Sequence, residues 1–143
     1  MKKTSPKIWK KLQGRLASGE LKLDESTLTS HSGDKWFAAN LPEAVALPRS
    51  VKSVSTILKF AHRHDIPVTP RGAGHGYVGG CVPSRGGIAL SLARMGRIRE
   101  INGKDFVAVV QPGVITGVLQ EEAEAKGLYY PPDPASRADC SIG

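Results

Sequence analysis

The chain has 143 residues, of which 40% are hydrophobic and 23% are charged, as in one compact domain or the first part of a larger protein. No apolar run approaches the roughly 20 residues of a transmembrane helix, and no secretory signal is visible at the N-terminus. Cys81 and Cys140 form no C-x-x-C pair. We therefore expect a cytoplasmic protein with two free thiols and no metal site.

The positive charge is concentrated at the start of the chain. Residues 1–22 hold seven Lys or Arg against one Glu, which accounts for most of the net charge of +7. Ile8, Trp9, Leu12 and Leu16 recur there at helical spacing, so we expect a helix with its apolar side packed on the domain. Peripheral contact with a membrane or with another subunit through this segment is the open alternative. Nucleic acid is not an expected partner, because no basic stripe with interleaved aromatics follows.

The first half of the chain then alternates between strands and a helix. Residues 22–42 are polar and are predicted to be irregular. A strand is predicted at 44–47, a helix from the N-cap Ser50 to His64, a strand that ends at Val68-Thr69, and another strand at 88–92. We expect residues 1–39 to form a basic lead helix and an irregular segment, and residues 40–143 to form the main domain.

The second half continues in the same manner. Strands are predicted at 97–101 and 106–110, joined by a turn at 102–105, and a helix is predicted at 114–126 with Gly127 as its stop. Residues 128–136 are predicted to be extended, because three prolines fall within four positions. The pattern favours the α+β class.

A glycine-rich stretch at residues 70–80 carries the strongest functional signal. Five glycines fall between positions 72 and 80, directly after a predicted strand. Successive backbone amides without Cβ neighbours can form a concave site for phosphate oxygens, and Arg71 would add a cation at its rim. A side chain at Gly74 is expected to occupy the phosphate position. The structural alternative is a flexible turn, although turns between strands are usually shorter.

Residues 74–79 also fit the G-x-G-x-x-G fingerprint of Rossmann dinucleotide-binding folds. That fingerprint works only where the glycines open a helix whose N-terminus meets the pyrophosphate. Pro83 and the pair Gly86-Gly87 would interrupt a helix here, and a strand follows at once. We therefore expect a strand–loop–strand unit whose loop amides hold the phosphates.

Five sequence blocks, in order, resemble one known family. They are 47–50, 66–74, 79–80, 110–113 and 130–136, followed by Ser141-Ile142-Gly143. Residues 40–143 are similar to the FAD-binding domain of the vanillyl-alcohol oxidase and para-cresol methylhydroxylase (PCMH) flavoproteins, in the branch of glycolate oxidase D-subunits and D-lactate dehydrogenases. The resemblance implies a PCMH-type domain consisting of its first small α/β subdomain and the start of the second, truncated at the C-terminus.

The resemblance also implies which residues contact FAD. Three segments match flavin-contacting segments of the family: the pyrophosphate loop, a proline-rich segment, and the beginning of a third segment. These residues are Pro70, Arg71, Gly72, Ala73, Gly74, His75 and Gly76; Pro132, Asp133, Pro134, Ala135, Ser136, Arg137 and Ala138; and Ser141, Ile142 and Gly143. The family's catalytic groups have no counterpart in this chain, so the catalytic residues are not identified.

The implied function is oxidation of a 2-hydroxy acid such as glycolate or D-lactate, with hydride transfer to FAD and reoxidation by an electron acceptor. The alternative is a truncated flavin- or nucleotide-binding module without activity, and the fragment alone is expected to be inactive. His75 departs from the glycolate-oxidase-like pattern, which has a small hydroxyl residue at this position. Other branches bond a histidine of this loop to the flavin. Non-covalent FAD is the favoured prediction and a covalent link through His75 is the alternative.

Overall fold

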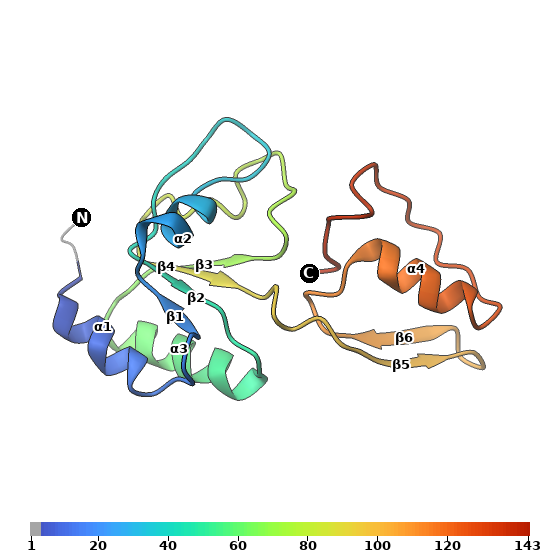
Figure 1. The fold of residues 1–143 in the computed structure, drawn as a ribbon, viewed down its shortest axis with the longest axis horizontal. Coiled ribbons are helices and arrows are strands. Elements are labelled where there is room, and N and C mark those ends of the chain that lie inside the picture. The colour runs from blue at the N-terminus through green and yellow to red at the C-terminus, as the bar shows by residue number, and fades with distance from the viewer. Residues whose placement is uncertain (1–3) are drawn as a thin grey trace.

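The computed structural model describes residues 4–143 as two lobes side by side (Figure 1). The first lobe contains α1 (Pro6–Gln13), β1 (Leu21–Lys22), α2 (Glu25–Ser30), β2 (Ala44–Ala46), α3 (Val51–Arg63), β3 (Val68–Arg71) and β4 (Ile88–Ser91). The second contains β5 (Ile98–Asn102), β6 (Val107–Val110) and α4 (Thr116–Glu124). Helices and strands are mixed as in the predicted α+β class.

The first lobe is built on a four-stranded sheet in the order β1-β2-β4-β3. Strands β2, β4 and β3 run parallel, and β1 pairs with β2 in the antiparallel sense. Every residue of β2 and β4 is buried, as expected for short, continuous apolar runs at the centre of a parallel sheet. Because β3 and β4 are parallel neighbours, the chain between them must cross back to the start of β4.

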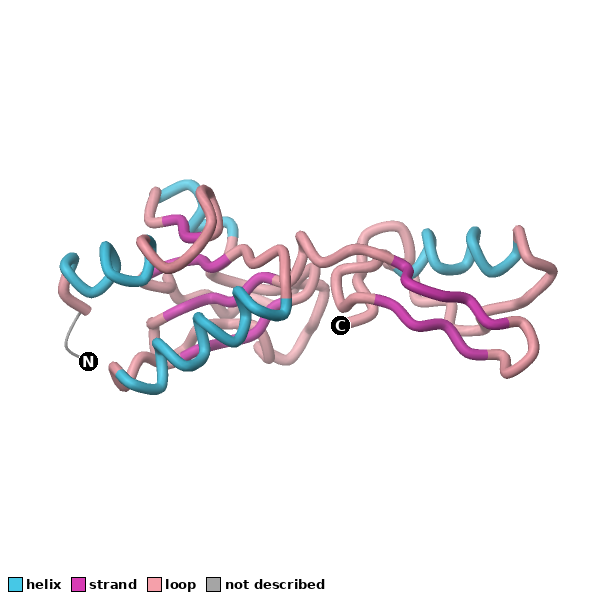
Figure 2. Tube along the Cα trace, turned by 90° about the horizontal axis from the view of Figure 1, so that it is seen from below, coloured by secondary structure: helices cyan, strands magenta, loops and turns pink. Residues whose placement is uncertain are grey.

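Helices α1 and α3 cover one face of this sheet, as Figures 1 and 2 show from two directions. Trp9 and Leu12 of α1 pack into the same buried cluster as Ile57 and Phe60 of α3 and Ile88 of β4. The lysines of α1 lie on its exposed side. The lead segment is thus an amphipathic helix packed through its apolar side, as predicted.

The prediction that residues 22–42 are irregular was wrong in part. Lys22 pairs with β2, and α2 follows from Glu25 to Ser30. The Asp24 carboxylate accepts the Thr27 amide at 3.0 Å and so caps the first turn of α2. No residue of α2 is buried, so the helix lacks the apolar periodicity by which sequence reasoning finds helices.

In the second lobe, β5 and β6 form an antiparallel hairpin beside α4 (Figure 1). The predicted turn is shifted by one residue, because Asn102 still pairs with Val107 and Phe106 takes a left-handed φ of 56°. Helix α4 is shorter than the predicted range 114–126, and residues 128–134 have no helix, as expected from their prolines. Within residues 4–143, no helix is long and apolar enough to cross a bilayer.

Candidate cofactor-binding site

The glycine-rich stretch is the first part of the connection that runs from the end of β3 to the start of β4. We call residues 72–80 the glycine loop. No helix occurs between β3 and β4, so the prediction of a strand–loop–strand unit is confirmed and the Rossmann arrangement does not apply. The loop lies between the two lobes, close to the end of the chain (Figure 1).

Backbone amides of the glycine loop are available to a ligand. None of the hydrogen bonds among residues 4–143 uses the amides of Gly74, His75 or Gly76. The amide of Ala73 donates to Ser141 Oγ at 2.9 Å, and this hydroxyl in turn donates to the carbonyl of Gly143. Three consecutive unpaired amides beside a satisfied one form the kind of donor set that suits phosphate oxygens.

The structure brings together the three segments that were predicted separately. We call residues 134–143 the C-terminal segment. A hollow of about 350 Å³ lies between the glycine loop and this segment, and we call it the interlobe hollow. Nine of its lining residues were predicted: Gly72, Ala73, Gly74, His75, Gly76, Pro134, Ser136, Ser141 and Gly143. It is also lined by Val78, Gly80, Cys81 and Cys140, which sequence reasoning did not assign.

Close packing explains why position 72 is a glycine. A Cβ at Gly72 would lie within 3.0 Å of both the Gly143 carbonyl oxygen and Ser141 Oγ. The C-terminal segment can therefore cross the loop only where the loop has no side chain.

Gly74 is restricted by its backbone and by a neighbouring side chain. Its φ is 78°, and a Cβ there would collide with the guanidinium of Arg71. Gly74 lines the interlobe hollow, whereas Arg71 does not. That a side chain at position 74 would also occupy the phosphate position stays a prediction.

Other predicted residues lie away from the hollow. Arg71 is half-buried, and its Nη1 donates to the Gly33 carbonyl and, at 3.3 Å, to Cys81 Sγ. Asp133 and Arg137 are 3.9 Å apart on the exposed surface. Pro70, Pro132, Ala135, Ala138 and Ile142 are likewise absent from the residues that line the hollow. Two of the predicted residues are instead hydrogen-bonded to α4. The Pro132 carbonyl accepts from Gln120 Nε2, and the Arg137 carbonyl accepts from the Gly117 amide.

His75 lies at the boundary of two hollows. It lines the interlobe hollow and also a polar hollow of about 330 Å³ on the other side of the loop, formed with residues 29–35. Its Nδ1 is buried and has no partner among the described residues. Buried polar atoms normally have a hydrogen-bond partner, so this nitrogen is available to a ligand beside the unpaired amides.

The polar hollow is bordered by residues that the sequence left unassigned. His31 is next to it, and burial lowers the pKa of this imidazole below its usual 6.5, with a smaller contribution from the Arg71 guanidinium. Asp34 accepts the amide of Gly79 at 2.8 Å. Neither residue carries a sequence signal, because the segment has no periodicity and no motif.

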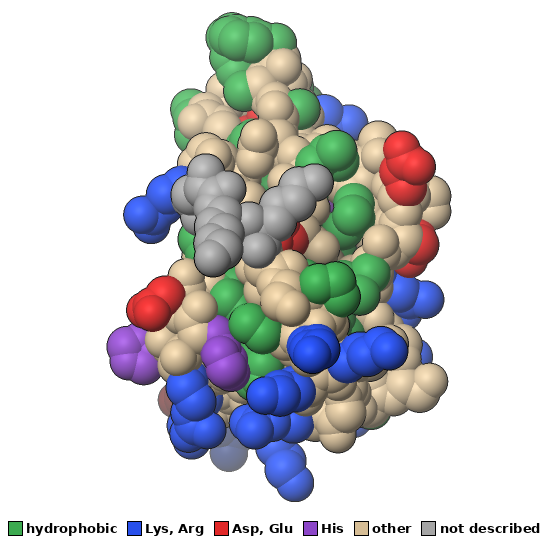
Figure 3. Space-filling view, turned by 90° about the vertical axis from the view of Figure 1, so that its left-hand side faces the viewer, with side chains coloured by type: hydrophobic (Ala, Val, Ile, Leu, Met, Phe, Trp, Pro, Cys, Tyr) green, Lys and Arg blue, Asp and Glu red, His purple; other side chains and the backbone are tan. Residues whose placement is uncertain are grey.

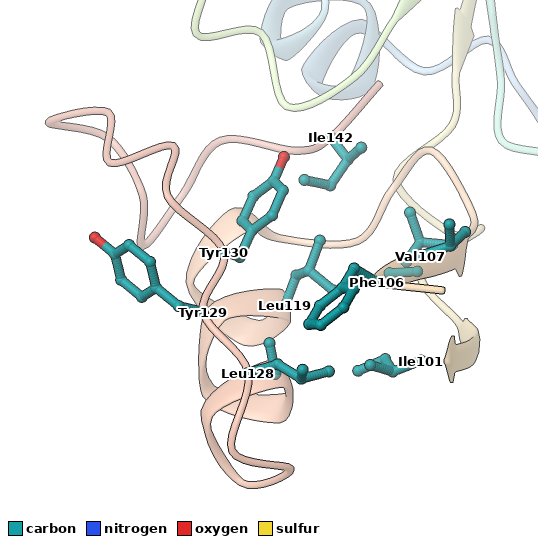
Figure 4. Close-up of a pocket in the computed structure, with 11 residues that line it drawn as sticks. Ile101, Phe106, Val107, Leu119, Leu128, Tyr129, Tyr130 and Ile142 are labelled. Carbon is teal, nitrogen blue, oxygen red and sulfur yellow. The ribbon is translucent and has the colours of Figure 1, made fainter. Parts of the chain in front are cut away.

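A third hollow, of about 230 Å³, lies wholly within the second lobe. Figure 4 shows Ile101 and Phe106 of the hairpin facing Leu119 of α4 and Leu128 of the following segment. Its lining is mostly apolar, which does not suit phosphate. Of the predicted site residues only Ile142 belongs to it.

Comparison with known proteins agrees with the geometry. A family model described as "FAD binding domain" matches residues 42–143. The glycolate oxidase subunit GlcD of Bacillus subtilis (strain 168) is 42% identical over 104 residues, which are 73% of this chain and 22% of that protein. The D-2-hydroxyglutarate dehydrogenase of Stutzerimonas stutzeri (strain A1501) is 36% identical over 142 residues, which are 98% of this chain and 30% of that protein.

Solved structures show the same fold. An alkyldihydroxyacetonephosphate synthase superposes with a TM-score of 0.87 over 99% of this chain and 31% of that chain. Its sequence identity is 22%, so this likeness concerns the fold alone. The chain spans less than a third of the length of each of these three proteins.

Proposed function

The chain belongs to the FAD binding domain family, and from that premise we propose that the interlobe hollow receives the pyrophosphate of FAD. The family resemblance predicted from the sequence is thereby confirmed. The observation that carries the proposal is that Gly74, His75 and Gly76 line one wall of the hollow and that their backbone amides have no partner among the described residues. These amides would be the donors to the phosphate oxygens.

The remaining walls of the hollow fit a dinucleotide. None of the residues that line it is acidic, so no carboxylate opposes a phosphate there. The site lies where two lobes meet, a common position for cofactors. Two further polar groups border the hollow: Ser136 on the side of the C-terminal segment, and His75, whose Nδ1 is buried, in the glycine loop.

The activity that this site supports is oxidation of a 2-hydroxy acid. The names of the two relatives refer to glycolate and to D-2-hydroxyglutarate. Bound flavin would supply the hydride-accepting chemistry, and the protein would bind and orient it. The catalytic groups and the electron acceptor are proposed to lie outside residues 4–143. A flavin-binding module without activity of its own is the second candidate, because the chain spans under a third of its relatives.

Titration of FAD against the purified chain tests the binding proposal. Flavin fluorescence should be quenched. The amide resonances of Gly74, His75 and Gly76 should show larger chemical-shift changes than those of β2. Excess ADP should compete, because it carries the same pyrophosphate. Unchanged loop resonances at millimolar FAD would contradict the site. Anaerobic addition of D-2-hydroxyglutarate or glycolate to a flavin-loaded form of the protein that also includes the proposed catalytic groups then separates the two candidates, since only an oxidoreductase bleaches the flavin.

FAD is proposed to be held without a covalent bond. The alternative is attack by the His75 imidazole on the 8α-methyl of the flavin. Acid precipitation of the flavin-loaded protein distinguishes them. A colourless pellet with free flavin in solution is expected. A yellow pellet that becomes colourless with His75→Ala would establish the covalent link instead.

The basic surface of α1 is proposed to give a cytoplasmic protein a peripheral contact with an anionic membrane. Lys7, Lys10, Lys11 and Arg15 are all exposed, and Figure 3 shows Lys and Arg side chains gathered on this side of the molecule. Such a surface attracts anionic headgroups. Cosedimentation with vesicles that contain phosphatidylserine is expected, and it should fall with salt and with Lys10→Glu/Lys11→Glu. Binding to another subunit, with no vesicle binding, would contradict it.

A further inference from the structure

The glycine loop is held from its outer side by a short segment far away in the sequence. We call residues 33–36 the clamp. Asp34 Oδ2 accepts the amide of Gly79 at 2.8 Å, and the amide of Lys35 donates to the carbonyl of Gly76 at 3.0 Å. The second oxygen of the same carboxylate, Oδ1, accepts the amide of Trp36 at 2.9 Å. Both carboxylate oxygens are therefore used by backbone amides.

Arg71 makes a further contact with the clamp. Its Nη1 donates to the carbonyl of Gly33, while the guanidinium packs against Gly74 so closely that a Cβ would not fit. The clamp thus reaches the loop at the end of β3 through Arg71 and again at Gly76 and Gly79. The unpaired amides of Gly74, His75 and Gly76 lie between the contact at Arg71 and the bond at Gly79.

We propose that Asp34 is a positioning residue for the cofactor, which acts by fixing the glycine loop with its free amides toward the interlobe hollow. This inference rests on the proposed FAD site. A loop with several glycines has many accessible conformations, and holding it in the binding conformation beforehand removes an entropic cost of binding. The Gly79 bond closes the loop at the far end from β3 and so limits those conformations.

Asp34 acts through the loop and not on the ligand. It lines the polar hollow on the outer side and is absent from the residues that line the interlobe hollow. Its two carboxylate oxygens accept from the amides of Gly79 and Trp36, so they bind backbone of the loop and of the clamp. The clamp also lies outside residues 42–143, the part that matches the family model.

Three variants of the chain test the role. Asp34→Ala removes both acceptors, Asp34→Asn keeps one, and Asp24→Ala is the matched control, because Asp24 caps α2 and is not bonded to the loop. Amide resonances report the loop without ligand, and a FAD titration reports affinity. For Asp34→Ala we expect broadened signals from Gly74 to Gly79, unchanged signals from β2 and α3, and FAD affinity reduced about tenfold.

The conservative variant separates positioning from a general loss of structure. Asp34→Asn should recover part of the affinity and of the loop signals, whereas Asp24→Ala should leave both within about twofold of wild type. Equal FAD affinity in wild type and Asp34→Ala would overturn the positioning role alone. Unchanged loop signals in Asp34→Ala would overturn it as well. Failure of the wild-type chain to bind FAD would overturn the proposed function and, with it, this role.

Discussion

At the scale of single residues, the absence of a side chain at position 72 connects the two lobes. Gly72 lets the C-terminal segment cross the loop, and Ser141 then accepts the Ala73 amide at 2.9 Å. Gly103 lies in the turn between β5 and β6, away from the interlobe hollow, and an added Cβ there would meet only the Leu128 side chain at 4.0 Å. Position 103 therefore tolerates a side chain where position 72 does not, which makes the two a matched pair of variants.

Gly72→Ala is expected to push the C-terminal segment away from the loop and break the bond from Ala73 to Ser141. The loss of one hydrogen bond costs about 1 kcal/mol, so FAD affinity should fall by roughly fivefold. Gly103→Ala should change it by less than about twofold. Isothermal titration with FAD measures both. Equal affinities for the two variants would show that the crossing does not shape the site.

Asp24 gives a pH-dependent contribution to the start of α2. Hydrogen bonds from the Thr27 and Ser26 side chains and from the Thr27 amide lower the pKa of its carboxyl from 3.8 to about 2. A carboxyl with a depressed pKa in the fold stabilises the fold above its unfolded value and loses this effect as it is protonated. The contribution should be complete above pH 3.8 and lost as pH falls toward 2.

Amide exchange at Thr27 measures this loss directly. Protection of that amide should fall between pH 4 and 2 after correction for the intrinsic rate, and Asp24→Asn should flatten the profile. A pH-independent Thr27 amide in the wild type would contradict the assignment of Asp24 as the cap.

At the scale of elements, α1 has one face that packs on the first lobe and one face that is exposed to solvent. Leu12 is fully buried against α3 and the sheet, whereas Lys11 beside it is exposed. Arg15, just after the helix, lies 5.3 Å from the centre of the Phe60 ring, so even the basic residues touch the core at one point. The lead helix is therefore part of the first lobe and not an independent tail.

Leu12→Ala should reduce the free energy of unfolding by about 2–5 kcal/mol, because it leaves a cavity between α1 and α3. Lys11→Ala should change it by no more than about 0.5 kcal/mol. Urea unfolding of both variants checks the difference. A small effect of Leu12→Ala would mean that α1 is not packed as described.

At the scale of the whole molecule, the two lobes differ in how well they are buried. The central strands of the first lobe are buried throughout, but β6 has three exposed residues of four, and Phe106 is 81% exposed. A two-stranded sheet is marginally stable by itself, so the stability of this lobe depends on the packing of the hairpin against α4. The interlobe hollow therefore lies between a lobe whose central strands are buried and a lobe whose hairpin is largely exposed.

Hydrogen exchange should show this difference. Amides of β5, β6 and α4 are expected to exchange through local opening at a lower free energy than those of β2 and β4. Saturating FAD should slow the exchange of the second lobe, since residues 140–143, some of which line the hollow, are hydrogen-bonded to Val114 and Thr116 at the start of α4. Equal protection of the two lobes in the free chain would contradict this description.

The sequence by itself determined the elements whose signals are local. The N-cap at Ser50, the apolar face of α3, the prolines after Gly127 and the glycines of the loop all act within a few residues, so their structures followed from nearest neighbours. Of the nine predicted residues that line the interlobe hollow, those of the glycine loop carried a signal of their own, whereas Pro134, Ser136, Ser141 and Gly143 were implied only by the family resemblance.

Only the tertiary structure decided how those pieces meet. Helix α2 has no buried face and left no pattern, and Asp34 bonds to a residue 45 positions away. Arg71 looked like a free cation beside glycines, yet it turns to the Gly33 carbonyl. Hydrogen bonds between distant segments depend on how the chain folds back, and no local spacing encodes that; the clamp and the crossing at Gly72 could therefore be seen only in the folded molecule.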